Sequence, residues 1–233
     1  MEGKEMKRFL SLFSGFMLML GLCGMADAYT INFDYVAVGN QFTSPYAVSV
    51  TVEDFEDDPY VWWQWSGSGE IVLGDVVNKY SAPAGVDSAN KDLSKYVTVP
   101  DPDGGSVGSI MVTELGDPGE AFNYFGIWWG SMDAYNTLTF YRGGAEVLSF
   151  TGAAVITDGA SYGDQLAYGS NHYVNFFFSG SESFDSFKMS SSNFAFEADN
   201  IAIGNVPVPV PPAIWLLGSG LVGLLTVRRK FRR

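Results

Sequence analysis

Few residues of this 233-residue chain could carry out catalysis. His172 is the single histidine, so a His-rich metal site cannot be built. Gly104 to Gly108 formally matches the G-x-S-x-G motif, but a nucleophile elbow needs a strand before it and a helix after it. A Pro- and Asp-rich stretch precedes the motif here, and the strand-like 109–112 follows. We therefore expect a non-catalytic protein, and a glycan-active enzyme that uses two carboxylates is a distant third alternative.

Acidic side chains cluster in three places where they could bind calcium. Asp101 and Asp103 offer oxygens at positions i and i+2 beside a glycine turn, and five acids crowd residues 53–58. Asp199, followed by Asn200, could supply a third site near a strand end. Ca²⁺ prefers such oxygen ligands. We expect that no cofactor is required, and we keep calcium as the alternative to plain solvated loops.

Tryptophans stand side by side in two places, Trp62-Trp63-Gln64-Trp65 and Trp128-Trp129. Adjacent residues of a strand point to opposite faces of the sheet. One ring of each pair can therefore enter a core while the other lies outside, where it could stack on a sugar ring. Trp63, Trp65, Trp128 and Trp129 are the candidate ligand-binding residues, and Trp63 is the favoured outward member of its pair. The alternative is that a layer of loops or a second chain covers the outward rings.

The elements that must position these residues read as β-strands. Short apolar and aromatic runs recur between Gly, Asn, Asp, Ser and Pro, and several alternate in polarity. Gly143-Gly144 predicts a hairpin turn, and no amphipathic helix is found. We predict one domain, residues 29–205, folded as an all-β two-sheet sandwich of jelly-roll type. The strand-like runs are 30–38, 47–52, 60–65, 70–77, 96–99, 109–114, 124–129, 137–141, 146–150, 172–179, 183–189 and 194–203.

The charge of residues 29–205 narrows the range of partners. This span holds 23 of the 26 acids and five of the 13 Lys and Arg residues, a formal charge near −18. A nucleic-acid partner is disfavoured, because little in the span could neutralise phosphates. Such acidity suits a secreted domain that binds cations or neutral sugars.

The N-terminal residues 1–28 predict a signal peptide. Basic side chains precede an apolar stretch from Phe9 to Gly21, and Ala26-Asp27-Ala28 forms an A-x-A cleavage site, so the mature chain would begin at Tyr29. Cys23 follows Leu22 rather than a small residue, which disfavours a lipoprotein. Cleavage removes this single cysteine, so no disulfide could stabilise the exported domain.

The C-terminal residues 206–233 combine prolines, an apolar stretch and a basic cluster. Residues 213–227 carry no charge and would span about 22 Å as a helix, whereas the 22 uncharged residues from Val206 would reach across a membrane. We predict a single short C-terminal transmembrane helix. The basic cluster, Arg228, Arg229 and Lys230 among it, would remain on the cytoplasmic side.

This order of segments resembles the PEP-CTERM sorting signal of bacterial exosortase substrates. The family's Pro-Glu-Pro is replaced by Pro-Val-Pro, which leaves the cleaved bond open. The resemblance implies export by the general secretion machinery, an inner-membrane intermediate, and transfer by an exosortase to the cell surface or extracellular matrix of a Gram-negative bacterium. The plain alternative is a permanent membrane anchor. The matching sorting-signal residues are Pro207, Pro209, Pro211, Pro212, Trp215, Arg228, Arg229 and Lys230.

Three blocks of the second half, residues 124–141, 173–178 and 194–202, resemble surface proteins that end in this tail, for which no activity can be carried over. The pattern Phe196-Glu197-x-Asp199-Asn200 is also similar to the last strand of jelly-roll carbohydrate-binding modules. We therefore expect a non-catalytic surface or matrix protein associated with exopolysaccharide or biofilm. The alternative is a lectin-like module that binds extracellular polysaccharide through tryptophan rings and calcium.

Overall fold

A computed structural model describes residues 29–57, 63–87, 90–113, 115–117, 119–179 and 182–207. Nearly all of its regular structure is β, and each helix is a single turn. The elements are β1 (Tyr29–Asn32), β2 (Val36–Val38), β3 (Gln41–Thr43), β4 (Thr51–Glu53), β5 (Gln64–Gly67), β6 (Glu70–Leu73), β7 (Lys95–Val99), β8 (Gly108–Thr113), β9 (Tyr124–Gly130), β10 (Asn136–Arg142), β11 (Ala145–Thr151), α2 (Gly152–Val155), η1 (Tyr168–Ser170), β12 (His172–Phe178), β13 (Ser186–Ser191) and β14 (Phe196–Gly204).

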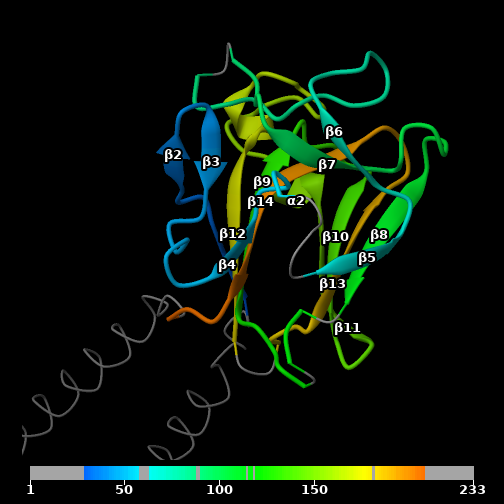
Figure 1. Cartoon of the computed structure of the whole chain (residues 1–233). Helices are drawn as coiled ribbons and strands as arrows, with labels where there is room; N and C mark the ends of the chain where they lie inside the picture. The colour runs from blue at the N-terminus through cyan, green and yellow to red at the C-terminus, as the bar shows by residue number, and fades with distance from the viewer. Residues whose placement is uncertain are drawn as a thin grey trace, which may run out of the picture.

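Two antiparallel sheets face each other and form a sandwich (Figure 1). The seven-stranded sheet has the order β1-β12-β9-β14-β7-β6, and β4 also pairs with β14. The five-stranded sheet has the order β11-β10-β13-β8-β5, and β2 and β3 form a separate hairpin. β14 pairs with β9 along one edge, and with β7 and then β4 along the other. The predicted all-β sandwich is confirmed.

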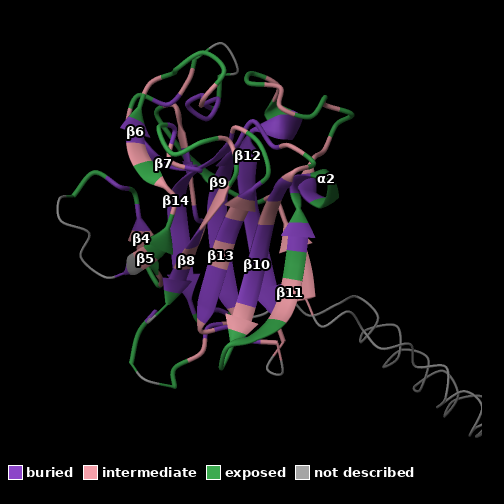
Figure 2. Cartoon of the chain, turned by 90° about the vertical axis from the view of Figure 1, so that its right-hand side faces the viewer, coloured by how far each residue is buried: buried purple, intermediate pink, exposed green. Residues whose placement is uncertain are grey.

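The main core lies between the two sheets and consists largely of aromatic rings. Phe125 packs edge-on against Phe140 and Phe187, at centroid distances of 5.0 and 4.9 Å. Trp129 stacks on Phe196 at 4.3 Å with the ring planes 9° apart. Figure 2 shows the central strands of the sandwich as mostly buried. These large rings supply the apolar area that a domain without disulfides needs.

Local chemistry explains where strands end. Gly143 and Gly144 have φ angles of 58° and 80° and connect β10 to β11, which confirms the predicted hairpin turn. The run predicted as one strand over 30–38 is two strands. The amide N–H of Asp34 donates to Asn32 Oδ1 at 2.7 Å, a local turn that replaces strand pairing. β3 was not predicted from the sequence.

A layer of loops covers the outer face of the seven-stranded sheet, the face turned away from the five-stranded sheet. This loop layer comprises residues 33–50, which include the β2–β3 hairpin, and residues 74–87 and 90–94. Phe42 from the loop layer packs on Trp128 at 5.5 Å, and Tyr46 packs on Tyr124 at 5.1 Å. Tyr80, also from the loop layer, packs on Tyr96 with the two ring centroids 6.3 Å apart. Both faces of this sheet are therefore buried.

The two ends of the described body lie at the same end of the sandwich. Tyr29 pairs with Phe178, and Tyr124 pairs with both Phe177 and Gly204. The backbone N–H of Val206 donates to Asn123 Oδ1 at 2.8 Å, and its carbonyl accepts from Asn123 Nδ2 at 2.9 Å. The sequence assigned Val206 to the tail, whereas these bonds attach it to the sandwich.

The predicted signal peptide, residues 1–28, lies outside the described residues, as do all the sorting-signal residues except Pro207. The predicted C-terminal transmembrane helix falls in the same undescribed part of the chain. Within the part that is described, no helix has the length and apolarity to span a membrane.

Replacement of Trp129 by Ala should destabilise the protein by about 3–5 kcal/mol, because the substitution removes a fully buried ring and leaves a cavity beside Phe196. Val107→Ala is the control, since Val107 is 68% exposed and its truncation should change stability by no more than ~0.5 kcal/mol. Urea denaturation measures both. Equal stabilities for the two variants would contradict the described packing.

Candidate functional site

The tryptophans predicted to bind a sugar are not exposed. Trp128 and Trp129 lie on opposite faces of the seven-stranded sheet, yet both are fully buried. Trp129 belongs to the core between the sheets, and Trp128 is sealed by Phe42 from the loop layer. Of the two alternatives for the outward ring of this pair, the structure shows the second: a layer of loops covers Trp128, so its ring is not open to a sugar.

Trp63, the predicted outward ring, also lies in the core and is 3% exposed. Its Nε1–H donates to Glu53 Oε2 at 2.8 Å, and Glu53 Oε1 accepts from the N–H of Phe55 at 2.9 Å. Trp65 is half-buried and packs against Trp63 at 6.1 Å. Trp62 lies outside the described residues. The buried rings of Trp63, Trp128 and Trp129 therefore offer no open face for a sugar, and Trp65 is only partly exposed.

The predicted calcium ligands lie apart. Asp103 is highly exposed and forms an ion pair with Lys79 at 2.9 Å, which lowers the pKa of Asp103. Asp101 Oδ1 accepts from the N–H of Asp103 at 2.8 Å. Asp199 is instead buried under the loop layer. Among the described residues, no three His, Cys, Asp or Glu side chains gather closely enough to hold a metal ion.

The features considered for catalysis do not form a triad. His172 is buried, its Nδ1 lies 3.0 Å from the carbonyl oxygen of Tyr168, and burial lowers its pKa. Residues 104–107 form a loop, and β8 begins at Gly108. The helix that a nucleophile elbow requires is therefore replaced by a strand, as predicted.

A pocket of about 340 Å³ opens at the end of the sandwich opposite Tyr29 and Gly204. Three connections form it: the segment after β6, the β9–β10 turn and the β13–β14 turn, with the loop before η1 at its rim. Two tyrosine rings, amides, hydroxyls and carboxyls line it. The lining residues are Val76, Asn78, Lys79, Tyr80, Ser131, Asp133, Tyr135, Gly163, Gln165, Asn193, Phe194, Ala195 and Glu197.

Glu197 is the most deeply buried acid of this pocket. It points to the outer face of β14, since its neighbours Phe196 and Ala198 belong to the main core. Its Oε1 accepts from the N–H of Ser81 at 3.0 Å, and its Oε2 accepts from Ser131 Oγ at 2.7 Å. Burial raises the pKa of Glu197 from 4.5 to about 8, although the two hydrogen bonds act to lower it. Glu197 is therefore mostly neutral at pH 7.

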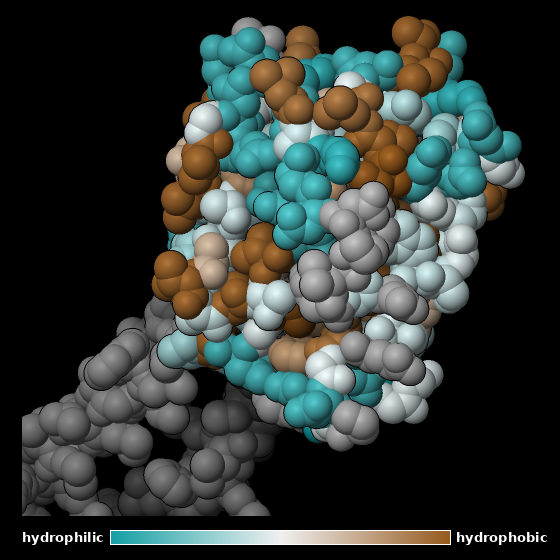
Figure 3. Space-filling model, viewed as in Figure 1, coloured by the Kyte–Doolittle hydropathy of each residue, from teal (hydrophilic) through white to brown (hydrophobic). Residues whose placement is uncertain are grey.

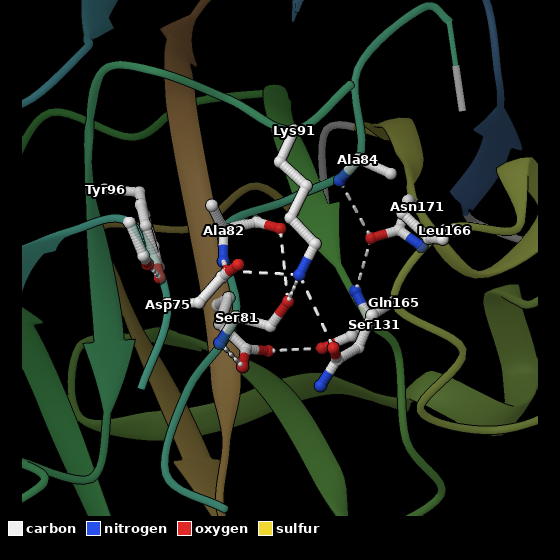
Figure 4. A network of polar contacts seen from close by, with 12 residues as sticks. Asp75, Ser81, Ala82, Ala84, Lys91, Tyr96, Ser131, Gln165, Leu166 and Asn171 are labelled. Atoms are coloured by element: carbon white, nitrogen blue, oxygen red, sulfur yellow. Dashed lines mark hydrogen bonds and ion pairs between the residues drawn. The ribbon is translucent and has the colours of Figure 1, made fainter. Parts of the chain in front are cut away.

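Lys91 connects the loop layer to the pocket (Figure 4). Its Nζ donates to Ser81 Oγ at 2.5 Å, to Asp75 Oδ1 at 3.1 Å and, weakly, to Gln165 Oε1 at 3.4 Å. Asp75 thus neutralises the Lys91 charge within the loop layer.

Asn171, at the start of β12, orders the pocket loops. Its Oδ1 accepts from the N–H groups of Ser131 at 2.8 Å and Ala84 at 3.1 Å. Its Nδ2 donates to the carbonyl oxygens of Asp164 and Ala167 at 2.6 and 3.0 Å. One amide side chain thereby joins three segments that are separate in the sequence.

The pocket offers many hydrogen-bond donors and acceptors, and the charges of its side chains are partly compensated. Lys79 is paired with Asp103, and burial raises the pKa of Asp133 as well as that of Glu197. Tyr135 donates its hydroxyl to the carbonyl oxygen of Phe194 at 2.7 Å, which orients the ring. Figure 3 shows apolar and polar side chains interspersed over the face seen in Figure 1. The pocket thus suits a neutral, hydroxyl-rich ligand.

Sequence reasoning did not find this pocket. Its residues come from loops far apart in the chain, and no local motif joins them. A usable signal existed only for Glu197, an acid directly between two apolar residues of β14, Phe196–Gly204, a strand whose residues are all buried. An acid in such a strand must be partnered or neutral.

The raised pKa of Glu197 predicts a pH-dependent stability. The folded protein favours the neutral acid, so Glu197 contributes its full stabilisation below about pH 5 and loses about 1.4 kcal/mol per pH unit as pH rises toward 8. Glu197→Gln should remove this contribution of Glu197 to the pH dependence of the free energy of unfolding. Glu146→Gln should retain it, because Glu146 is exposed on β11. Urea unfolding at pH 5 to 8 measures the slope. Parallel curves for wild type and Glu197→Gln would contradict the assignment.

Comparisons with known proteins find likeness among solved structures. No family model matches it, and no curated protein does. Among solved structures, a family 29 carbohydrate-binding module from Piromyces equi is 14% identical, with 78% of this chain and 96% of that chain covered and a TM-score of 0.35. A family 11 carbohydrate-binding module from Clostridium thermocellum, in complex with a β-1,3-1,4-mixed-linked tetrasaccharide, is 12% identical, with coverages of 68% and 98% and a TM-score of 0.24. The catalytic unit of a GH87 α-1,3-glucanase from Streptomyces thermodiastaticus is 12% identical, with coverages of 65% and 28% and a TM-score of 0.29.

Proposed function

We propose that this protein is a non-catalytic carbohydrate-binding module that takes a neutral saccharide unit into the pocket around Glu197. The observation that carries this proposal is the pocket itself. Its volume of about 340 Å³ falls within the ~300–1,000 Å³ range of small-molecule sites, and its lining is polar. The coarse sandwich architecture is shared with carbohydrate-binding modules. A jelly-roll winding, supported by the way the chain alternates between the sheets from β7 to β10, belongs to the same proposal.

The lining matches the chemistry of sugar hydroxyls. A hydroxyl group donates one hydrogen bond and accepts others, and the amides of Asn193 and Gln165 likewise do both. Tyr80 and Tyr135 add phenolic hydroxyl groups to the polar lining. A neutral ligand is favoured because the span 29–205 carries a formal charge near −18, which repels acidic polysaccharides.

Removal of the exposed amides tests this proposal. In Asn193→Ala/Gln165→Ala, each lost hydrogen bond should cost about 0.5–1.5 kcal/mol, so binding of a neutral exopolysaccharide should weaken roughly 5- to 150-fold without loss of melting temperature. Thr51→Ala is the control, because Thr51 is exposed at the other end of the sandwich. Affinity electrophoresis against neutral glucans and the host polysaccharide measures binding. Unchanged affinity in the double variant would exclude the pocket, and release of sugar products would contradict a non-catalytic role.

The same proposal includes export and sorting by an exosortase, which rest on the sequence of residues 1–28 and 206–233. The geometry of the body is compatible with processing at both ends. β1 begins at Tyr29, immediately after the predicted cleavage site, and the backbone bonds to Asn123 end at Val206. Cleavage before Tyr29 and after Pro207 would leave these contacts intact. The body would then associate with polysaccharide at the cell surface.

Intact-mass measurement of the protein from its native host tests sorting. The surface form should begin at Tyr29 and lack the peptides that follow Val210. Deletion of residues 213–233 should release the body from the membrane fraction, because the apolar stretch and the basic cluster are removed together. A surface form that still contains Arg228 and Arg229 would identify a permanent anchor instead.

A further inference from the structure

Two carboxyl groups meet beneath the loop layer, away from the pocket. Asp199 lies on the outer face of β14 and is 0% exposed, and Asp92 lies in the loop layer and is 2% exposed. Their side chains are within hydrogen-bond distance of each other. In the described part of the protein the ion pairs join Lys79 to Asp103 and Lys91 to Asp75, so neither member of the Asp92–Asp199 pair has a cationic partner there.

The hydrogen bonds around this pair leave one oxygen unused. Asp92 Oδ1 accepts from the N–H of Ser94 at 2.9 Å, from Ser94 Oγ and, weakly, from Gln41 Nε2. The two oxygens of Asp199 accept from the backbone N–H and the Nδ2 of Asn200, at 2.7 and 2.8 Å. Asp92 Oδ2 is buried and accepts no hydrogen bond from any described residue.

We propose that Asp92 and Asp199 bind one divalent cation, Ca²⁺, between their carboxylates. The side chains of Asp92, Asp199 and Ser94 offer oxygen atoms as ligands, which favours Ca²⁺ over a transition metal. Ser94 Oγ is already at the pair, and rotation of the Gln41 amide by half a turn would direct its oxygen there in place of its NH₂ group. The cation would compensate the charge of the two carboxylates when both are ionised, and it would occupy the unused Asp92 Oδ2.

This site would differ in kind from the predicted loop site at Asp101 and Asp103, where Lys79 already supplies the positive charge. It would join β3, the 91–94 segment and β14, which are far apart in the sequence. Ca²⁺ would therefore fasten the loop layer to the sheet and stabilise the folded protein.

Terbium luminescence provides a direct test, because Trp128 is the cross-strand partner of Asp199 and can sensitise a bound Tb³⁺ ion. Titration of the full chain in detergent should give emission that saturates at one ion per chain and is displaced by Ca²⁺. Asp92→Asn and Asp199→Asn should each weaken Tb³⁺ binding at least about tenfold. Asp101→Asn/Asp103→Asn is the matched control and should bind Tb³⁺ as the wild type does.

Thermal unfolding of the wild type is a second test, which does not depend on whether the variants fold. Ca²⁺ at 100 times its Kd should raise the melting temperature by about 5 °C or more, and chelator should reverse the shift. The proposal would be overturned if neither millimolar Ca²⁺ nor chelator changed the melting temperature and no sensitised emission appeared. That result would indicate a proton shared by the two acids. Emission lost in the Asp101/Asp103 control but kept in Asp199→Asn would overturn it as well.

Discussion

Burial of acidic side chains between the seven-stranded sheet and the loop layer is the constraint on which the rest of the structure depends. A carboxyl group removed from water needs hydrogen-bond donors or a proton. For Glu197 the donors are Ser81 from the loop layer and Ser131 from the β9–β10 turn. The loops are therefore held in place by the polar groups of the outer face as well as by the rings of Phe42 and Tyr46. This arrangement also creates the pocket, because the same connections that reach Glu197 form its walls.

The strands could be predicted from sequence, but the covering of the outer face could not. β10 and β8 were found from short apolar runs between turn residues, with boundaries displaced by a residue. β9 and β12 are nearly continuous apolar runs, and this is typical of strands buried on both faces. A run of this kind favours buried positions for both Trp128 and Trp129, whereas the alternation rule places only one of the two rings in the core.

The pocket lay beyond sequence reasoning for a different reason. Asn171 joins three loops through one side chain, and the contacts span as many as 87 residues of sequence. Such pairings depend on the strand order, which single-sequence patterns do not specify. The proposed calcium site could not be found from the sequence for the same reason. Asp199 could be selected as an acid near a strand end, but its neighbour Asp92 comes from a segment that carries no calcium motif.

The position of β14 has a mechanical consequence. β14 is the last strand, lies inside the seven-stranded sheet, and is paired along both edges, whereas β1 forms an outer edge of that sheet. A force applied at Pro207 therefore acts along the axis of β14 and loads its ladders to β9, β4 and β7 together. A force on Tyr29 instead loads a single ladder, the one that joins β1 to β12. The chain is thus far better built to resist tension at its C-terminal side than at its N-terminal side.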